Sequence, residues 1–190
     1  VFQLITYVFT EGNIEASHYY ISYHLPFTMG EFAAIGAGKT ALVDVFPQYQ
    51  LLLPYLLQPI FHLFGLTTGS FTFVMVGLSV VGLLALYWVF SWLTGSALAA
   101  LMLYVPFVAV ALFPTVNGDP YRFSVFAYYA VAPLRYFGPW IVTLLCAAAI
   151  RRPDPFHYSL LFLVGASVAL NNVDFGLAAW VGSLAAIVVS

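Results

Sequence analysis

Charged side chains are scarce in this sequence of 190 residues. Asp, Glu, Lys and Arg make up only 6% of the chain, whereas 63% of the residues are hydrophobic and the mean hydropathy is +0.99. A soluble domain carries about 25% charged residues. The stretches 71–93 and 97–113 contain no charge at all and approach the roughly 20 residues that a helix needs to cross a bilayer. The composition therefore predicts an all-α, polytopic transmembrane helix bundle and excludes an ordinary water-soluble domain.

Basic residues and cysteine are also rare. Five Lys and Arg residues and a net charge of −2 leave no electrostatic footprint for nucleic acid, which we exclude as a partner. Cys146 is the only cysteine, so it can form no intramolecular disulfide and no metal site by itself. We expect it to be a small core residue.

The hydrophobic runs predict one partial transmembrane domain over residues 1–190. It comprises the end of a first helix (1–9), an outer loop (10–50), a juxtamembrane helix (51–64) and about five transmembrane helices over 71–190. The five helices correspond to the apolar runs 71–93, 97–113, 136–150, 156–170 and 175–189. The chain begins without Met and stops inside an apolar run, so we expect it to be an excerpt of a longer protein.

The orientation follows from the distribution of basic residues. Arg151 and Arg152 form the one concentrated basic cluster between closely spaced runs, so the positive-inside rule predicts that their loop is cytoplasmic. Counting helices backwards places residues 91–96 on the same side. Residues 114–135 and 171–174 are then expected on the outer side.

The predicted orientation of the short helix 51–64 determines on which side of the membrane the long first loop lies. Tyr55, Gln58 and His62 are three and four residues apart, which gives a polar stripe on an apolar cylinder. The helix would reach only about 21 Å, less than the hydrocarbon thickness of about 30 Å. We therefore expect it to lie in the membrane interface, with the stripe towards water and Leu52, Leu56 and Leu63 towards lipid or neighbouring helices. The loop 10–50 is then outside.

Acidic side chains and an imidazole gather at the start of this loop. Glu11, Glu15 and His18 have the spacing i, i+4, i+7, so a helix would place them on one face. Such a group suits a general base, which must reach the hydroxyl that it deprotonates. A solvated loop face is the alternative that the spacing leaves open. A metal site of the Glu-x-x-His kind would need further copies on facing helices.

The end of the loop carries one isolated carboxylate, Asp44, among apolar residues directly before the juxtamembrane helix. It is a candidate for substrate or cation placement, and capping or turn formation is the alternative. The preceding Gly38-Lys39-Thr40 is no P-loop, because that motif needs glycine where the chain has Ala33. No nucleotide site is predicted.

Further candidates lie in the other predicted outer loops. Arg122 and Arg135 carry guanidinium groups that can bind a lipid phosphate through two parallel hydrogen bonds. Anchoring in the membrane interface is the alternative for either arginine. Asn172 and Asp174, with the neighbouring Asn171, should converge on the same side as the first loop.

The order of these features has a parallel in a known family. An acidic start at residues 11–20 is followed by Gly38-Lys39, by the run Leu42-Val43-Asp44-Val45-Phe46-Pro47-Gln48-Tyr49 and by an apolar helix that ends at Gly65. The chain thus resembles the membrane-embedded GT-C glycosyltransferases, especially bacterial relatives of the protein mannosyltransferase and aminoarabinose transferase group. In those enzymes the first outer loop carries acidic residues, contains juxtamembrane helices and forms the active site with a polyprenyl-phosphate sugar donor.

The resemblance implies a role for each candidate. Glu15 or Glu11 would be the catalytic base, and Asp44 would be the second acidic position. The chain has glutamate where aspartate is common at the first position, and Gln50 where relatives have glycine. The Asn171–Gly176 run is similar to an Asn-x-acid-Phe-Gly element in some relatives. The residues expected to bind the substrate are His18, Gln48, Tyr49, Arg122, Arg135, Asn172 and Asp174.

These features predict a multi-pass enzyme of the bacterial inner membrane. It would move a sugar from a polyprenyl-phosphate donor to an acceptor hydroxyl on the outer face, with no cofactor beyond a possible divalent cation. A transporter or channel is the main alternative, for which charges inside the membrane would be expected, and the runs 71–93 and 97–113 have none. A non-catalytic membrane scaffold is also left open.

Overall fold

The structure, a computed structural model, describes residues 25–112 and 132–190. Within these residues the chain is helical, and an isolated bridge between Ala41 and Val45 is the only β geometry. A helix at residues 25–36 is followed by α3 (Leu53–Phe64), α4 (Thr68–Thr94), α5 (Ala97–Leu112), α6 (Ala132–Arg151), α7 (Pro155–Asn171), the π-helix η1 (Val173–Leu177) and α8 (Ala178–Val189). The predicted all-α class is confirmed for this part of the chain.

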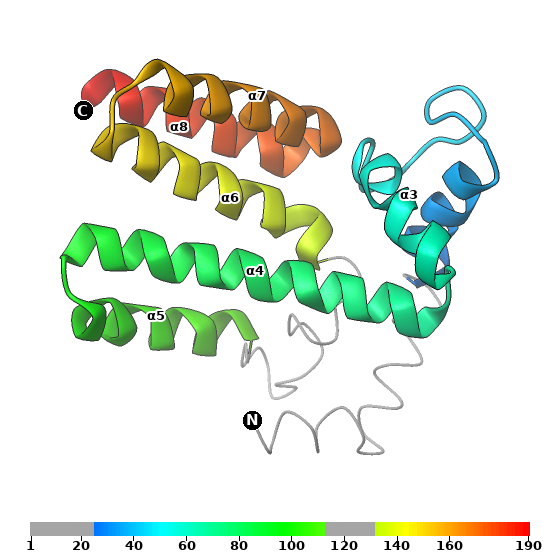
Figure 1. The fold of residues 1–190 in the computed structure, drawn as a ribbon, viewed down its shortest axis with the longest axis horizontal. Coiled ribbons are helices and arrows are strands. Elements are labelled where there is room, and N and C mark those ends of the chain that lie inside the picture. The colour runs from blue at the N-terminus through cyan, green and yellow to red at the C-terminus, as the bar shows by residue number, and fades with distance from the viewer. Residues whose placement is uncertain (1–24, 113–131) are drawn as a thin grey trace.

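The long helices lie roughly alongside one another, and the described connections between them lie at two ends (Figure 1). At one end, the Arg151 guanidinium donates to the carbonyl oxygen of Trp92 at 3.4 Å. At the other end lie α3, the helix 25–36 and the turn between α7 and α8, where the amide of Leu51 donates to the carbonyl oxygen of Asn171 at 2.9 Å. The loops at 91–96 and 151–152 therefore share one end, and residues 51 and 171 share the other, as helix counting predicts. The predicted outer loop 114–135 lies largely outside the described residues. Which end faces the cytoplasm stays a prediction.

Two of the described helices are long and apolar enough to cross a membrane. These are α4, with 27 residues, and the 19-residue stretch of α6 from Pro133 to Arg151. At 1.5 Å per residue α4 extends about 40 Å, which exceeds the hydrocarbon thickness of about 30 Å. The other apolar helices, α5, α7 and the stretch Val173–Val189, have 10–17 residues.

Local side-chain chemistry sets the ends of these helices. The hydroxyl of Thr67 accepts from the amide of Ser70 at 3.1 Å, and the hydroxyl of Ser70 accepts from the amide of Thr67 at 2.9 Å, which is a complete capping box at the start of α4. Gly95 ends α4 with a φ of 64°, a left-handed conformation that glycine adopts without strain. At the start of α7, Asp154 accepts from the amide of His157 at 2.9 Å.

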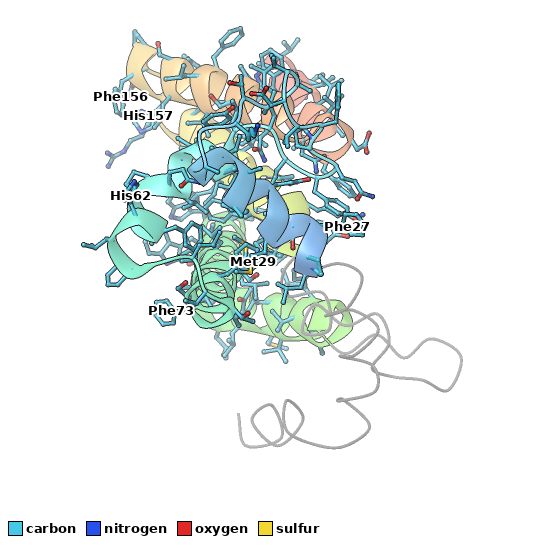
Figure 2. All side chains as sticks on the ribbon, turned by 90° about the vertical axis from the view of Figure 1, so that its right-hand side faces the viewer. Phe27, Met29, His62, Phe73, Phe156 and His157 are labelled. Atoms are coloured by element: carbon cyan, nitrogen blue, oxygen red, sulfur yellow. The ribbon has the colours of Figure 1, made fainter. Side chains whose placement is uncertain are left out.

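Glycines allow the long helices to pack closely. A Cβ atom added at Gly82 of α4 would lie 2.4 Å from Cε3 of Trp140 in α6, and one at Gly165 of α7 would lie 2.2 Å from Cδ1 of Trp180 in α8. Small residues play this role where membrane helices approach each other. Large apolar side chains point outwards instead: Phe73 and Phe156 project away from the bundle in the end-on view (Figure 2) and are 82% and 70% exposed.

The helix at residues 25–36 corrects the prediction of a loop throughout 10–50. Its buried residues, Leu25, Thr28, Glu31, Phe32 and Ile35, lie at helical spacing. The ring of Phe32 makes edge contacts at 5.4 Å with both Phe61 of α3 and Phe71 of α4. These aromatic contacts fix the helix 25–36 and α3 to one end of the bundle.

The polar stripe of α3 is used differently from the prediction. Tyr55 and His62 are exposed, but the side-chain amide of Gln58 donates to the carbonyl oxygen of Phe32 at 2.9 Å and does not simply face water. The hydroxyl of Tyr55 accepts from the amide of Ala41 at 2.8 Å. The stripe therefore also holds the preceding loop and the helix 25–36 against α3.

Candidate functional site

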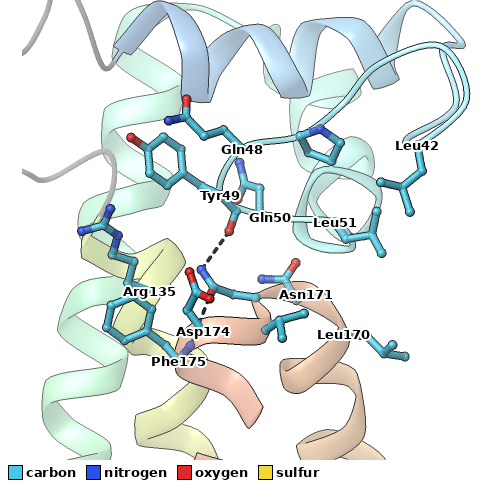
Figure 3. A pocket seen from close by; sticks show the side chains of 13 residues that line it. Leu42, Gln48, Tyr49, Gln50, Leu51, Arg135, Leu170, Asn171, Asp174 and Phe175 are labelled. Carbon is cyan, nitrogen blue, oxygen red and sulfur yellow. Dashed lines mark hydrogen bonds between the residues drawn. The ribbon is translucent and has the colours of Figure 1, made fainter. Parts of the chain in front are cut away.

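A pocket of about 510 Å³ lies where the segment before α3 meets the turn between α7 and α8 (Figure 3). Residues 47–51 form one wall and residues 170–175 the other, with Arg135 of α6 and Leu42 completing the lining. The volume is within the range of roughly 300–1,000 Å³ that is usual for small-molecule sites. The pocket thus joins three segments that are far apart in the sequence.

Asn171 attaches the first wall to the end of α7. Its side-chain oxygen accepts from the amides of Leu52 at 2.8 Å and Leu53 at 2.7 Å, and its backbone oxygen accepts from the amide of Leu51 at 2.9 Å. The N-cap residue of α3, Leu52, has no side chain that could accept these amides. A residue 119 positions further along the chain therefore supplies the cap of α3.

Asn172 connects the two walls of the pocket. Its side-chain NH₂ donates to the carbonyl oxygen of Tyr49 at 2.9 Å, while its side-chain oxygen accepts from the amide of Phe175 at 3.2 Å (Figure 3). The turn into η1 is tight, because a Cβ atom at Gly176 would lie 2.1 Å from the carbonyl oxygen of Val168. Glycine at this position allows the second wall to fold back onto α7.

Arg135 is the cation of the pocket. Its guanidinium carbon lies 5.3 Å from the ring centre of Tyr49 and 5.6 Å from that of Phe175. Such cation–π contacts hold the guanidinium beside the two aromatic rings without using its N–H groups as hydrogen-bond donors. Within residues 25–112 and 132–190, Arg135 makes no hydrogen bond and no ion pair. No described residue therefore occupies its donors, which can bind a ligand.

The pocket has one acidic side chain among the residues described. Asp174 lines it from the first turn of η1 and is exposed. The exposed amide side chain of Gln48 lies in the opposite wall. A free guanidinium, a carboxylate and amide groups can together bind a ligand that carries both an anionic group and hydroxyl groups.

No family model, curated protein or solved structure matches this chain. The interpretation of the pocket therefore depends on its own geometry.

The structure brings five of the predicted binding residues together in this pocket, and their function stays a prediction. They are Gln48, Tyr49, Arg135, Asn172 and Asp174.

Other predicted residues lie elsewhere or outside the described segments. Asp44 is not among the lining residues; its carboxylate accepts from the amide of Thr40 at 2.8 Å and closes its own turn. Residues 1–24 and 113–131 are not described, and they contain the predicted Glu11, Glu15, His18 and Arg122.

Glu31, which the sequence analysis did not select, lies behind the wall 47–51. Its Oε1 atom accepts from the amides of Gln48 at 2.5 Å and Tyr49 at 3.4 Å. Burial raises the pKa of its carboxyl group, while the hydrogen bond from Gln48, the nearby side chain of Gln50 and the amide of Tyr49 act in the opposite direction. A lone carboxylate at the buried spacing of the helix 25–36 is the signal that could have identified it.

Proposed function

We propose that this chain is the membrane-embedded part of a glycosyltransferase that uses a polyprenyl-phosphate sugar donor. The observation that supports this proposal is the guanidinium of Arg135, which contacts the rings of Tyr49 and Phe175 in a pocket at one end of an apolar helix bundle and makes no hydrogen bond to a described residue. A lipid-linked phosphate needs this combination, because its chain stays in hydrocarbon while its headgroup reaches the end of the bundle. The function is a proposal from geometry and from the family resemblance.

The surface of the bundle supports a multi-pass position in a membrane. The described part of α4 carries no charged residue, yet Phe73, Val81, Leu84 and Trp88 are more than half exposed. In a soluble protein a helix that is hydrophobic on all sides is buried in the core. Exposed apolar side chains around α4 are expected when lipid is the solvent. A bacterial plasma membrane is the location that the family resemblance implies.

In the proposed reaction, Arg135 binds the phosphate of the donor. The acceptor oxygen forms a bond to the anomeric carbon of the sugar, the bond from that carbon to the phosphate oxygen breaks, and the phosphate leaves on its lipid. Negative charge therefore builds on the phosphate, and a positioned guanidinium stabilises that charge. The planar fork of Arg135 is suited to two phosphate oxygens at once.

The acceptor hydroxyl must lose its proton during the same step. Glu15 or Glu11 is the proposed base, as the resemblance implies, and takes this proton as the new bond forms. Asp174 is the described carboxylate that lines the pocket, where it can accept hydrogen bonds from sugar or acceptor hydroxyls. Arg135 is the group proposed to stabilise the charge that develops on the phosphate.

Sugar transfer by the complete protein in detergent or liposomes tests the proposal. We expect Arg135→Ala to lower turnover by about 10² to 10³, the usual cost of removing one donor to a developing anion, and Arg135→Lys to restore only part of it because the fork is lost. Glu15→Gln or Glu11→Gln should cost about 10² to 10⁴.

Arg152→Ala is the matched control, because Arg152 is exposed and does not line the pocket. Undiminished transfer after simultaneous replacement of Arg135, Glu11 and Glu15 would rule out this mechanism. An absence of transfer across a broad panel of donors would favour the transporter or the scaffold.

A further inference from the structure

Among the residues that the structure describes, three buried polar atoms in and behind the pocket wall 47–51 have no hydrogen-bond partner. They are Oε2 of Glu31 and both side-chain polar atoms of Gln50. Both residues are more than nine-tenths buried, with 8% exposure for Glu31 and 2% for Gln50. Buried polar groups are usually paired, so an unpaired cluster needs an explanation. The mechanism proposed above gives Glu31 no part in catalysis.

Glu31 is connected to Arg135, the proposed phosphate-binding residue, through Tyr49. Its Oε1 atom holds the amides of Gln48 and Tyr49, which fixes the backbone from which the Tyr49 ring projects. That ring lies 5.3 Å from the guanidinium carbon of Arg135. On the opposite side the carbonyl oxygen of Tyr49 accepts from the side chain of Asn172. The backbone of Tyr49 is thus fixed at both polar groups: its amide donates to Glu31, and its carbonyl oxygen accepts from Asn172.

We propose that Glu31 is a positioning residue for phosphate binding, which fixes residues 48 and 49 so that the Tyr49 ring holds the Arg135 guanidinium in the pocket. This inference rests on the proposed function, in which Arg135 binds the phosphate of a lipid donor. Glu31 does not line the pocket and therefore acts through Tyr49. Its contribution is to reduce the cost of ordering the arginine when the ligand binds.

Two substitutions distinguish whether Glu31 acts as a hydrogen-bond acceptor or through its negative charge. The two backbone amides need an acceptor at Oε1, and a neutral side chain with a carbonyl oxygen can supply it. Replacing Glu31 with glutamine keeps this acceptor and adds an NH₂ group, which can donate to the unpaired Oε1 of Gln50. Replacing it with methionine keeps the length of the side chain but removes the acceptor. If Glu31 acts by positioning residues 48 and 49, the Glu31→Gln variant should bind the phosphate ligand normally and the Glu31→Met variant should bind it more weakly.

The test is binding of farnesyl phosphate to the complete protein in detergent, with farnesol as the uncharged comparison. We expect Glu31→Met to weaken farnesyl phosphate binding about tenfold, the loss that corresponds to one missing buried hydrogen-bond acceptor, and Glu31→Gln to stay within about twofold of the original protein. Hydrogen exchange at the amides of Gln48 and Tyr49 should be faster in Glu31→Met and unchanged in Glu31→Gln. Glu31→Ala is the second variant, should the methionine variant fail to fold.

Gln58→Leu is the matched control. It removes a hydrogen bond to Phe32, on the same helix as Glu31, without touching residues 48 and 49. Normal farnesyl phosphate binding by this variant would show that the effect at Glu31 is more than a loosened helix. Binding weakened as much as in Glu31→Met would overturn the inference.

The remaining outcomes separate the inference from the proposed function. Equal loss of binding in Glu31→Gln and Glu31→Met would overturn positioning by an acceptor, and so would glutamine and methionine variants that both bind normally. Loss of sugar transfer with normal binding in Glu31→Gln would make Glu31 catalytic and would also overturn it. If Arg135→Ala binds farnesyl phosphate as the original protein does, the proposed phosphate site itself is wrong, whatever the exchange of residues 48 and 49.

Discussion

Asn171 accepts three hydrogen bonds from residues 51–53, two at its side-chain oxygen and one at its backbone oxygen. Two of them, from the amides of Leu52 and Leu53, cap α3 across 119 and 118 positions of sequence. Removing the side-chain acceptor would leave two partly buried amides without a partner, which costs more than the bond itself contributes. The stability of α3 therefore depends on a residue in a different helix.

We expect Asn171→Ala to lower the free energy of unfolding by about 1–2 kcal/mol, as for the loss of a helix cap. Thermal unfolding in detergent is the measurement. Asn171→Asp keeps an oxygen acceptor for both amides and should retain most of the stability. If the alanine variant melts at the original temperature, or if the aspartate variant is equally unstable, the cap does not hold α3 as described.

Residue types indicated the pocket but not its architecture. The sequence analysis selected Arg135, Asn172 and Asp174 because a guanidinium, an amide and a carboxylate in outer loops suit a phosphate and hydroxyl ligand, and these residues do meet. The role of Asn171 as the cap of α3 was not predictable, because a hydrogen bond between residues 119 positions apart leaves no pattern in the neighbouring sequence. Glu31 escaped notice because the carboxylates at the start of the loop match a catalytic spacing and a single buried glutamate does not.

At the scale of helices, close packing depends on glycine at particular positions. Gly82 and Gly77 lie on the same helix, α4, and differ only in their surroundings. A Cβ at Gly82 would collide with Trp140, whereas nothing lies within 4 Å of a Cβ at Gly77. Overpacking of such a contact forces helices or rings to move.

Gly82→Ala should therefore destabilise the bundle by about 1–3 kcal/mol, seen as a lower melting temperature in detergent, since the Trp140 ring has to shift. Gly77→Ala serves as its control and should be neutral or slightly stabilising, because alanine favours a helix over glycine. Equal melting temperatures for the two variants would contradict the packing of α4 against α6 described above.

The helices themselves were largely predictable, and their boundaries less so. Apolar runs at 71–93 and 97–113 correspond to α4 and α5 within a few residues. The predicted run 175–189 begins instead as the π-helix η1, because Asn172 accepts the amide of Phe175 and Gly176 approaches Val168. The helix 25–36 was missed because its apolar spacing stands inside a polar stretch.

At the scale of the whole molecule, the two ends of the bundle predict a labelling pattern. Val173 lines the pocket and Val43 follows Leu42, which also lines it, whereas Ser96 lies between α4 and α5 and Pro153 between α6 and α7; all four residues are exposed. With the buried Cys146 replaced by alanine, single cysteines at 43 and 173 should react with an impermeant reagent added outside intact cells. Cysteines at 96 and 153 should react only after the membrane is opened, since the Arg151 and Arg152 loop is expected in the cytoplasm.

Labelling of position 153 from outside would show that the predicted orientation in the membrane is wrong. A split within either pair would contradict the grouping of the loops itself, which the contacts at both ends support.

The cap supplied by Asn171 also determines when the pocket can form during synthesis of the chain. The amides of Leu52 and Leu53 leave the ribosome long before their acceptor, because 119 residues separate Asn171 from Leu52. At the usual synthesis rate of about 5–20 residues per second, that interval is roughly 6–24 s. Throughout it α3 lacks its cap, and Tyr49 lacks the amide of Asn172 that joins the two walls. A nascent chain therefore cannot form the complete pocket until the end of α7 and the turn into η1 have been made.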